Sequence, residues 1–122
     1  MTARHIDWFE IYVQDMARAR AFYEAMLDTR LEQISSGIEM WAFPASSDAA
    51  GASGALVRYE GYPSGGNSTI VYFRCDDCAV EAARAAAHGG RVFKDKFSIG
   101  PHGFIALVTD SEGNMIGLHS PK

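Results

Sequence analysis

The strongest constraint on the fold is a repeated order of elements in the two halves of the chain. Aligning Val13 with Cys75, at an offset of 62 residues, matches a strand, a helix and three further strands in each half. The same offset places Leu56 on Leu118 in the last strand-like segment of each half. Few residues are identical, so a coincidence of two generic α/β patterns is the alternative. Because element order and spacing agree throughout, we favour a duplicated module with two sheets related by a pseudo-two-fold axis.

The first half begins with the alternation of a strand and continues with the periodicity of a helix. Residues 6–13 alternate, with Phe9, Ile11 and Val13 on one face, which predicts a strand whose odd-numbered face packs against helices. Asp15 is expected to cap the amphipathic helix that follows. Residues 44–53, rich in Ala, Ser and Gly, are interpreted as a mobile loop. The other strands expected in this half are Leu31–Ser35, Ile38–Phe43 and Gly54–Tyr59.

The pattern restarts after residues 62–67, the strongest cluster of turn-forming residues in the chain. Asp77 is expected to cap an Ala-rich helix, and Gly89–Gly90 to end it in a left-handed conformation. Residues 110–114 are expected to turn between the last two strands. The strands expected in this half are Thr69–Cys75, Arg91–Phe97, Phe104–Thr109 and Met115–Ser120.

Length and charge limit the classes of function. A chain of 122 residues, 48% of them hydrophobic, is expected to form one domain over residues 1–122. Its formal net charge of −4 disfavours nucleic acid and anionic membranes as partners. No glycine-rich run follows a strand and opens a helix, so nucleotide binding is not expected. With no secretion signal or long apolar run, the predicted location is the cytoplasm.

Two motifs give the chain a family resemblance. The helix Asp15–Tyr23 and the turn Asp110–Asn114 resemble those of the vicinal oxygen chelate superfamily, which includes glyoxalase I, extradiol dioxygenases and bleomycin-resistance proteins. The resemblance implies an α+β fold in which two tandem βαβββ modules form a partly open, cleft-bearing barrel. The modules would cover about residues 5–61 and 67–121, and the protein would be a homodimer with its ligand site in the cleft.

The same resemblance argues against a metal cofactor in this chain. Metal-using members hold one divalent ion with His or Glu side chains from the first and last strands of each module. The corresponding positions here are Trp8, Ala55, Ile70 and Gly117, none of which ligates a metal through its side chain. We therefore expect no metal at the family's usual site and no cofactor.

The predicted cleft instead suits a small organic molecule, because aromatic rings and a few polar groups converge there. The candidate ligand-binding residues, taken from the even face of the first strand and its counterparts, are Trp8, Glu10, Tyr12, Ile70, Tyr72, Arg74, Met115 and His119.

Three questions about these side chains stay open at this point. Glu10 and Arg74 are candidates for a structural ion pair, while an anionic substrate competing for Arg74 is the alternative. His119 is a candidate general base or an ordinary structural histidine. A binding protein is therefore weighed against an enzyme, of lyase, isomerase or dioxygenase type, that uses Glu10 and His119 with an altered or metal-dependent centre.

Cys75 and Cys78 form a C-x-x-C sequence at a strand-to-helix junction. Two intervening carboxylates oppose the lowered thiol pKa that a redox centre needs. Zinc binding would need two further strong ligands. We predict two structural thiols.

Overall fold

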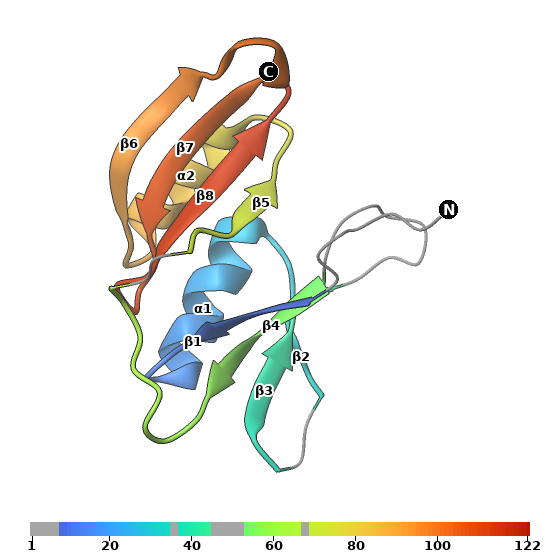
Figure 1. Cartoon of the computed structure of the whole chain (residues 1–122), viewed down its shortest axis with the longest axis vertical. Coiled ribbons are helices and arrows are strands. Elements are labelled where there is room, and N and C mark those ends of the chain that lie inside the picture. Colours follow the sequence, from blue (N-terminus) through green and yellow to red (C-terminus); the bar gives the residue numbers. More distant parts are fainter. Residues whose placement is uncertain (1–7, 35–36, 45–52, 67–68) are drawn as a thin grey trace.

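The computed structural model describes residues 8–34, 37–44, 53–66 and 69–122. These residues form two four-stranded sheets, each with one α-helix (Figure 1). The first sheet has the order β1-β4-β3-β2 and the second the order β5-β8-β7-β6. The first module contains β1 (Trp8–Tyr12), α1 (Met16–Leu27), β2 (Glu32–Gln33), β3 (Glu39–Ala42) and β4 (Ser53–Arg58). The second contains β5 (Tyr72–Arg74), α2 (Cys78–Ala87), β6 (Arg91–Ser98), β7 (Phe104–Thr109) and β8 (Met115–Ser120).

Strand register confirms the predicted repeat. In the first sheet β1 runs parallel to β4, with Glu10 opposite Ala55. In the second sheet β5 runs parallel to β8, with Tyr72 opposite Gly117. The offset of 62 residues carries the first pair onto the second, and it carries β4 onto β8 over their whole length. The two tandem βαβββ modules of the predicted α+β fold are therefore present, and the two sheets do not close into one.

The strands β7 and β8 have the predicted bounds, whereas two strands at sheet edges are shorter than predicted. The segment expected over Leu31–Ser35 pairs with β3 only at Glu32 and Gln33. The segment expected over Thr69–Cys75 forms ladder pairs with β8 only from Tyr72 to Arg74. Each is an edge strand with a single neighbour, so side-chain alternation alone does not determine how far its pairing extends. Most of the loop predicted over residues 44–53 falls outside the described residues.

Both helices begin at the predicted aspartate caps. The Asp15 carboxylate accepts a hydrogen bond from the Arg18 backbone N–H at 3.0 Å, and Asp77 accepts one from the Ala79 N–H at 3.0 Å. α2 is followed by Gly89 with φ of +100°, the left-handed conformation expected there. None of the helices in the described ranges has the length and apolar composition needed to span a membrane.

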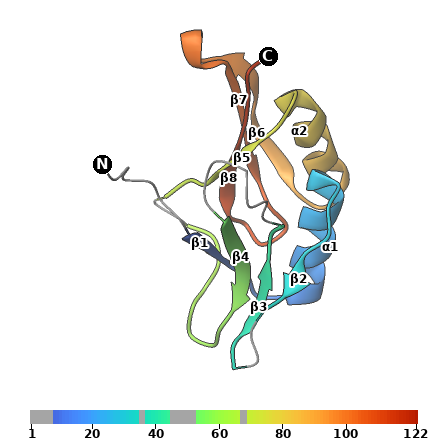
Figure 2. The same cartoon turned by 90° about the vertical axis from the view of Figure 1, so that its right-hand side faces the viewer.

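The helices lie on one side of the two sheets and pack against each other (Figure 2). Between helices and sheets lies one continuous core to which both modules contribute. Ile11 and Val13 of the first strand segment are buried in it, as the odd-numbered alternation predicted. The opposite faces, here called the open faces, carry no helix, and Trp8 and Tyr72 on them remain 40% and 48% exposed.

Candidate ligand-binding site

The open face of the first sheet presents a carboxylate between two aromatic donors. Trp8 Nε1 donates to Glu10 Oε2 at 3.1 Å, and the Tyr12 hydroxyl donates to Glu10 Oε1 at 2.8 Å. These side chains alternate along β1, so they share one face of the strand. The hydrogen bond to Glu10, with partial burial, raises the pKa of the Tyr12 hydroxyl and keeps it a donor.

A row of tyrosines extends this surface beyond β1. The Tyr12 ring stacks on Tyr62 with centroids 5.1 Å apart, and Tyr62 lies 5.1 Å from Tyr59. Tyr59 and Tyr62 belong to the connection between the modules and are about half exposed. The sequence pattern had placed Tyr59 at the end of the strand Gly54–Tyr59 and Tyr62 in the turn cluster 62–67, so the contact between the two rings was not predicted. Two tyrosines spaced three residues apart at the end of a strand, Tyr59 and Tyr62, were the sequence signal that could have predicted this row of rings.

The open face of the second sheet is arranged differently. The Tyr72 ring lies across β8 on the α-carbon of Gly117, where it occupies the space of a side chain. His119 Nε2 lies 2.7 Å from the backbone carbonyl oxygen of His102. Because a carbonyl only accepts, this nitrogen is the donor and Nδ1 is left as the acceptor in the neutral ring. His119 is thus anchored to the turn that follows β6.

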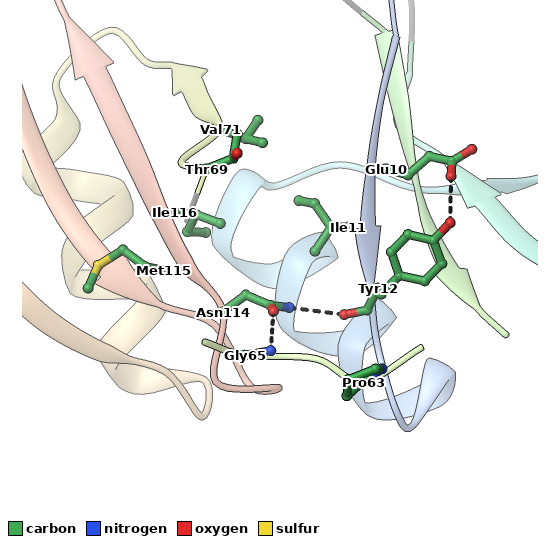
Figure 3. Close-up of a pocket in the computed structure, with 10 residues that line it drawn as sticks. All are labelled: Glu10, Ile11, Tyr12, Pro63, Gly65, Thr69, Val71, Asn114, Met115 and Ile116. Carbon is green, nitrogen blue, oxygen red and sulfur yellow. Dashed lines mark hydrogen bonds between the residues drawn. The ribbon is translucent and has the colours of Figure 1, made fainter. Parts of the chain in front are cut away.

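A pocket of about 190 Å³ lies between β1 and β8, at the junction of the modules (Figure 3). Ile11 and Ile116 approach each other across it from the two strands. Of the predicted ligand-binding residues, Glu10, Tyr12 and Met115 line it. Asn114 closes one end, since its Nδ2 donates to the Tyr12 carbonyl at 3.1 Å and its Oδ1 accepts from the Gly65 N–H at 2.6 Å.

The remaining predicted residues lie elsewhere on the molecule. Tyr72 and Arg74 line a separate pocket beside β5, and Trp8, Ile70 and His119 line neither pocket. The side chains of Glu10 and Arg74, both within the described ranges, form no ion pair with each other. Among the described residues no hydrogen bond joins Glu10 to His119 either: Glu10 accepts from Trp8 and Tyr12, and His119 donates to the His102 carbonyl.

The acidic turn between β7 and β8 positions the pocket by joining the modules. Glu112 accepts hydrogen bonds from the backbone N–H groups of Gln14 and Asp15, and Arg18 binds it through Nε and Nη2 at 2.7 and 2.9 Å. Burial acts to raise the pKa of this carboxyl, but these hydrogen bonds outweigh it and lower the pKa to about 2. The turn was recognised in the sequence as a motif, whereas its contacts with the first module were not predicted.

Tyr23 and Asp110 extend this connection into the core. The buried Tyr23 hydroxyl donates to Asp110 Oδ2 at 2.6 Å. Burial and the neighbouring carboxylate hold the pKa of Tyr23 well above its usual range, so the hydroxyl remains a donor. Asp110 in turn orients Asn114, which donates to the same oxygen at 2.9 Å. The residue that closes the pocket is therefore fixed from the core.

Comparison with known proteins agrees with this architecture. Residues 5–118 match the model of the Glyoxalase/Bleomycin resistance protein/Dioxygenase superfamily. The chain belongs to this superfamily. No match was found among curated proteins.

Solved structures of the superfamily share the fold over nearly the whole chain. A glyoxalase/bleomycin resistance protein from Albidiferax ferrireducens, 18% identical, superposes with a TM-score of 0.72 over 93% of this chain and 96% of its own. One from Streptomyces sp. CB03234 is 26% identical, with a TM-score of 0.69 over 93% and 98%. TnmS3, an antibiotic binding protein from the same organism, is 26% identical, with a TM-score of 0.67 over 100% and 99%.

The residues predicted to occupy the superfamily's usual metal positions have side chains that do not suit a divalent ion. Trp8 begins β1, Ala55 and Gly117 are buried in β4 and β8, and Ile70 precedes β5. The Tyr72 ring covers Gly117, where a ligating side chain would have to stand. Within residues 8–34, 37–44, 53–66 and 69–122, no cluster of three or more His, Cys, Asp or Glu side chains is arranged to hold a metal.

The two cysteines are free and buried, as expected of structural thiols. Burial, followed by the nearby Glu81 carboxylate, raises the pKa of Cys75 to about 12. A thiol with so high a pKa is protonated at neutral pH, so it is a poor nucleophile.

Proposed function

We propose that this protein binds a small aromatic organic molecule on the open face of its first sheet, beside the pocket between β1 and β8, without a metal ion. The main support is the Glu10 carboxylate, which is held by Trp8 and Tyr12 on an exposed surface. A carboxylate has about four lone-pair sites. Two internal donors therefore leave it able to accept a hydrogen bond from a ligand.

The surroundings of Glu10 favour a flat ligand. The Trp8 indole and the stacked Tyr12 and Tyr62 rings offer faces for stacking, while Ile11 and Ile116 make the adjacent pocket apolar. An N–H or O–H donor on the ligand would then meet Glu10. Binding to a molecule of this kind is consistent with the structural similarity to the antibiotic binding protein TnmS3.

The chain offers a matched pair of tryptophans for testing this proposal. Trp8 lies on the open face, whereas the Trp41 ring lies on the other face, 3.5 Å below the Arg20 guanidinium. Bleomycin and a panel of flat polycyclic antibiotics are titrated while tryptophan emission is recorded, with thermal shift as a second readout. A bound ligand should quench emission in Trp41→Phe, which retains Trp8, but not in Trp8→Phe.

A second variant tests the role of the carboxylate. Glu10→Gln should weaken binding about tenfold or more, because it removes a charged hydrogen-bond acceptor. A chelator should not change the affinity. Binding that persists unchanged in both Trp8→Phe and Glu10→Gln would contradict the proposed site.

A further inference from the structure

The hydrogen-bond donors around Glu10 are already committed to acceptors within the chain (Figure 3). The Trp8 indole N–H and the Tyr12 hydroxyl both donate to Glu10. The side-chain amide of Asn114 donates to the Tyr12 carbonyl and to Asp110 Oδ2. An indole has one N–H, a tyrosine one O–H and a side-chain amide two N–H bonds. These three side chains therefore have no donor left for a ligand.

The acceptors of the same surface are only partly used. Each Glu10 oxygen accepts one hydrogen bond from the described residues, whereas a carboxylate offers about four lone-pair sites. The Tyr12 hydroxyl oxygen also keeps lone pairs when its proton is donated. Thr69 adds a hydroxyl to the pocket wall, and a hydroxyl can donate or accept. A ligand therefore meets a surface that mainly accepts hydrogen bonds, so a ligand that brings donors is favoured.

The Glu10 carboxylate also has no positive partner in the described part of the chain. It is exposed on β1 and forms no ion pair with any residue in the described ranges. No lysine, arginine or histidine is among the described residues that line the adjacent pocket. Arg58, at the end of the neighbouring strand β4, donates its Nε to the Gln14 carbonyl at 3.1 Å. The charge that Glu10 presents to a ligand is therefore negative.

Aromatic rings flank this carboxylate and favour the same kind of ligand. Trp8 and Tyr12 lie two residues to either side of Glu10, and Tyr62 stacks on Tyr12 with ring centroids 5.1 Å apart. Trp8 is 40% exposed and Tyr62 51% exposed, so ring surface is available to a bound molecule. The face of an aromatic ring attracts a cation, and Trp does so most strongly. Rings and carboxylate therefore select for positive charge together.

We propose that the ligand of this site is an aromatic molecule with a protonated amine, an inference that rests on the proposed function. The ammonium group would donate to Glu10, and the flat body would pack against Trp8 and the stacked tyrosines. An ammonium group has three donors and adds Coulombic attraction to the carboxylate. A carboxylate ligand would find neither an opposite charge nor a free donor on these side chains.

Three probes of similar shape test the charge preference. Naphthylmethylammonium, neutral naphthylmethanol and anionic naphthoate are titrated into the full chain at neutral pH while amide chemical shifts are recorded. The cation should bind about tenfold more tightly than the alcohol, and naphthoate less tightly than either. The shifts should change along β1 around Glu10. Added salt should weaken binding of the cation and not of the alcohol, because it screens exposed charges.

Two substitutions that each remove one negative charge assign the preference to a residue. Glu10→Gln should reduce the affinity for the cation to about that of the alcohol for the parent protein. Glu39→Gln, at an exposed position of β3, should leave the tenfold preference unchanged. The thermal midpoint of each variant reports whether it is folded.

The outcomes separate this inference from the proposed function. If all three probes bind with equal affinity, or if the preference survives in Glu10→Gln, the charge selectivity is wrong while binding on this face stands. Tighter binding of naphthoate than of the cation would also overturn the inference alone. If no probe binds saturably below about 10 mM, the proposed function is overturned together with the inference.

Discussion

At the residue scale, Glu112 is a buried carboxylate whose partners belong to the other module. Its side chain is fully buried, whereas that of its partner Arg18 is 55% exposed. The first module supplies two backbone N–H groups and the Arg18 guanidinium to it. Removing a carboxylate of this kind leaves several donors unpaired, so we expect Glu112→Ala to lower the free energy of unfolding by about 3 kcal/mol at neutral pH. Urea denaturation measures this loss of free energy of unfolding. Glu39→Gln, at an exposed position, is the control for the loss of one negative charge.

The lowered pKa of Glu112 also predicts how stability depends on pH. Folding lowers the pKa of this carboxyl from 4.5 to about 2, so the folded state favours the charged form. Its contribution is therefore complete above about pH 5 and is lost as the pH falls toward 2. The free energy of unfolding should fall over this window in the parent protein and fall less steeply in Glu112→Gln. Equal slopes in the two proteins would show that this carboxyl is not responsible.

Trp8 and Gly117 lead to a prediction about metal chemistry. Neither side chain can ligate an ion, and Tyr72 covers Gly117. Calorimetric titration with Ni²⁺ or Zn²⁺ should show no stoichiometric site, and turnover of the methylglyoxal–glutathione hemithioacetal should stay undetectable with either ion. Metal-dependent turnover would mean that these positions were matched to the wrong residues.

At the scale of elements, the end of α2 is pressed against β7. Gly90 donates its N–H to the Ala85 carbonyl at 2.9 Å. A Cβ at Gly90 would collide with the Thr109 carbonyl oxygen and lie 2.7 Å from the Phe22 ring. Because the obstructing oxygen belongs to the backbone of a strand, it cannot move aside cheaply. The glycine is needed for close approach rather than for a positive φ.

Gly90→Ala should therefore lower the free energy of unfolding by about 2–3 kcal/mol through overpacking. Gly37→Ala is the matched control, because nothing lies within 4 Å of the added Cβ. Thermal or urea unfolding of the two variants gives the difference. A loss at Gly90 no larger than at Gly37 would contradict the packing described for α2 and β7.

At the scale of the whole molecule, the open faces expose large side chains that a second copy of the chain would cover. Trp8 and Tyr72 on these faces, and Ile70 just before β5, are each about 40–50% exposed. Exposed apolar surface of this kind is typical of association sites. We expect a homodimer that joins these faces.

At micromolar concentration, light scattering should give a molar mass twice the 13.3 kDa of one chain. Tyr72→Lys should shift the protein toward the monomer, because it places a charge in the interface. Val80→Lys is the control, since Val80 is 46% exposed on α2, on the side away from the open faces. A monomeric parent protein, or equal effects of the two substitutions, would rule out this arrangement.

Local sequence patterns determined the elements and their repeat. The alternation around β1 predicted which side chains enter the core, and Asp15 and Asp77 predicted where the helices begin. These features depend on contacts within one strand or one helical turn, so the sequence contains them directly. The offset of 62 residues then predicted that β1 and β4 of the first module correspond to β5 and β8 of the second, because both modules have the same order of elements.

The tertiary structure alone decided which polar groups meet. Nothing near Glu112 in the sequence indicates that it binds the start of α1. Strand alternation places Trp8 and Tyr12 on the same face as Glu10, but it does not decide between them and Arg74 as its partners. Partner choice between distant charges depends on how the modules dock and on where burial makes a pairing necessary. The same docking creates both pockets, because each is lined by residues from both modules. Their walls exist only once the two halves of the chain have come together.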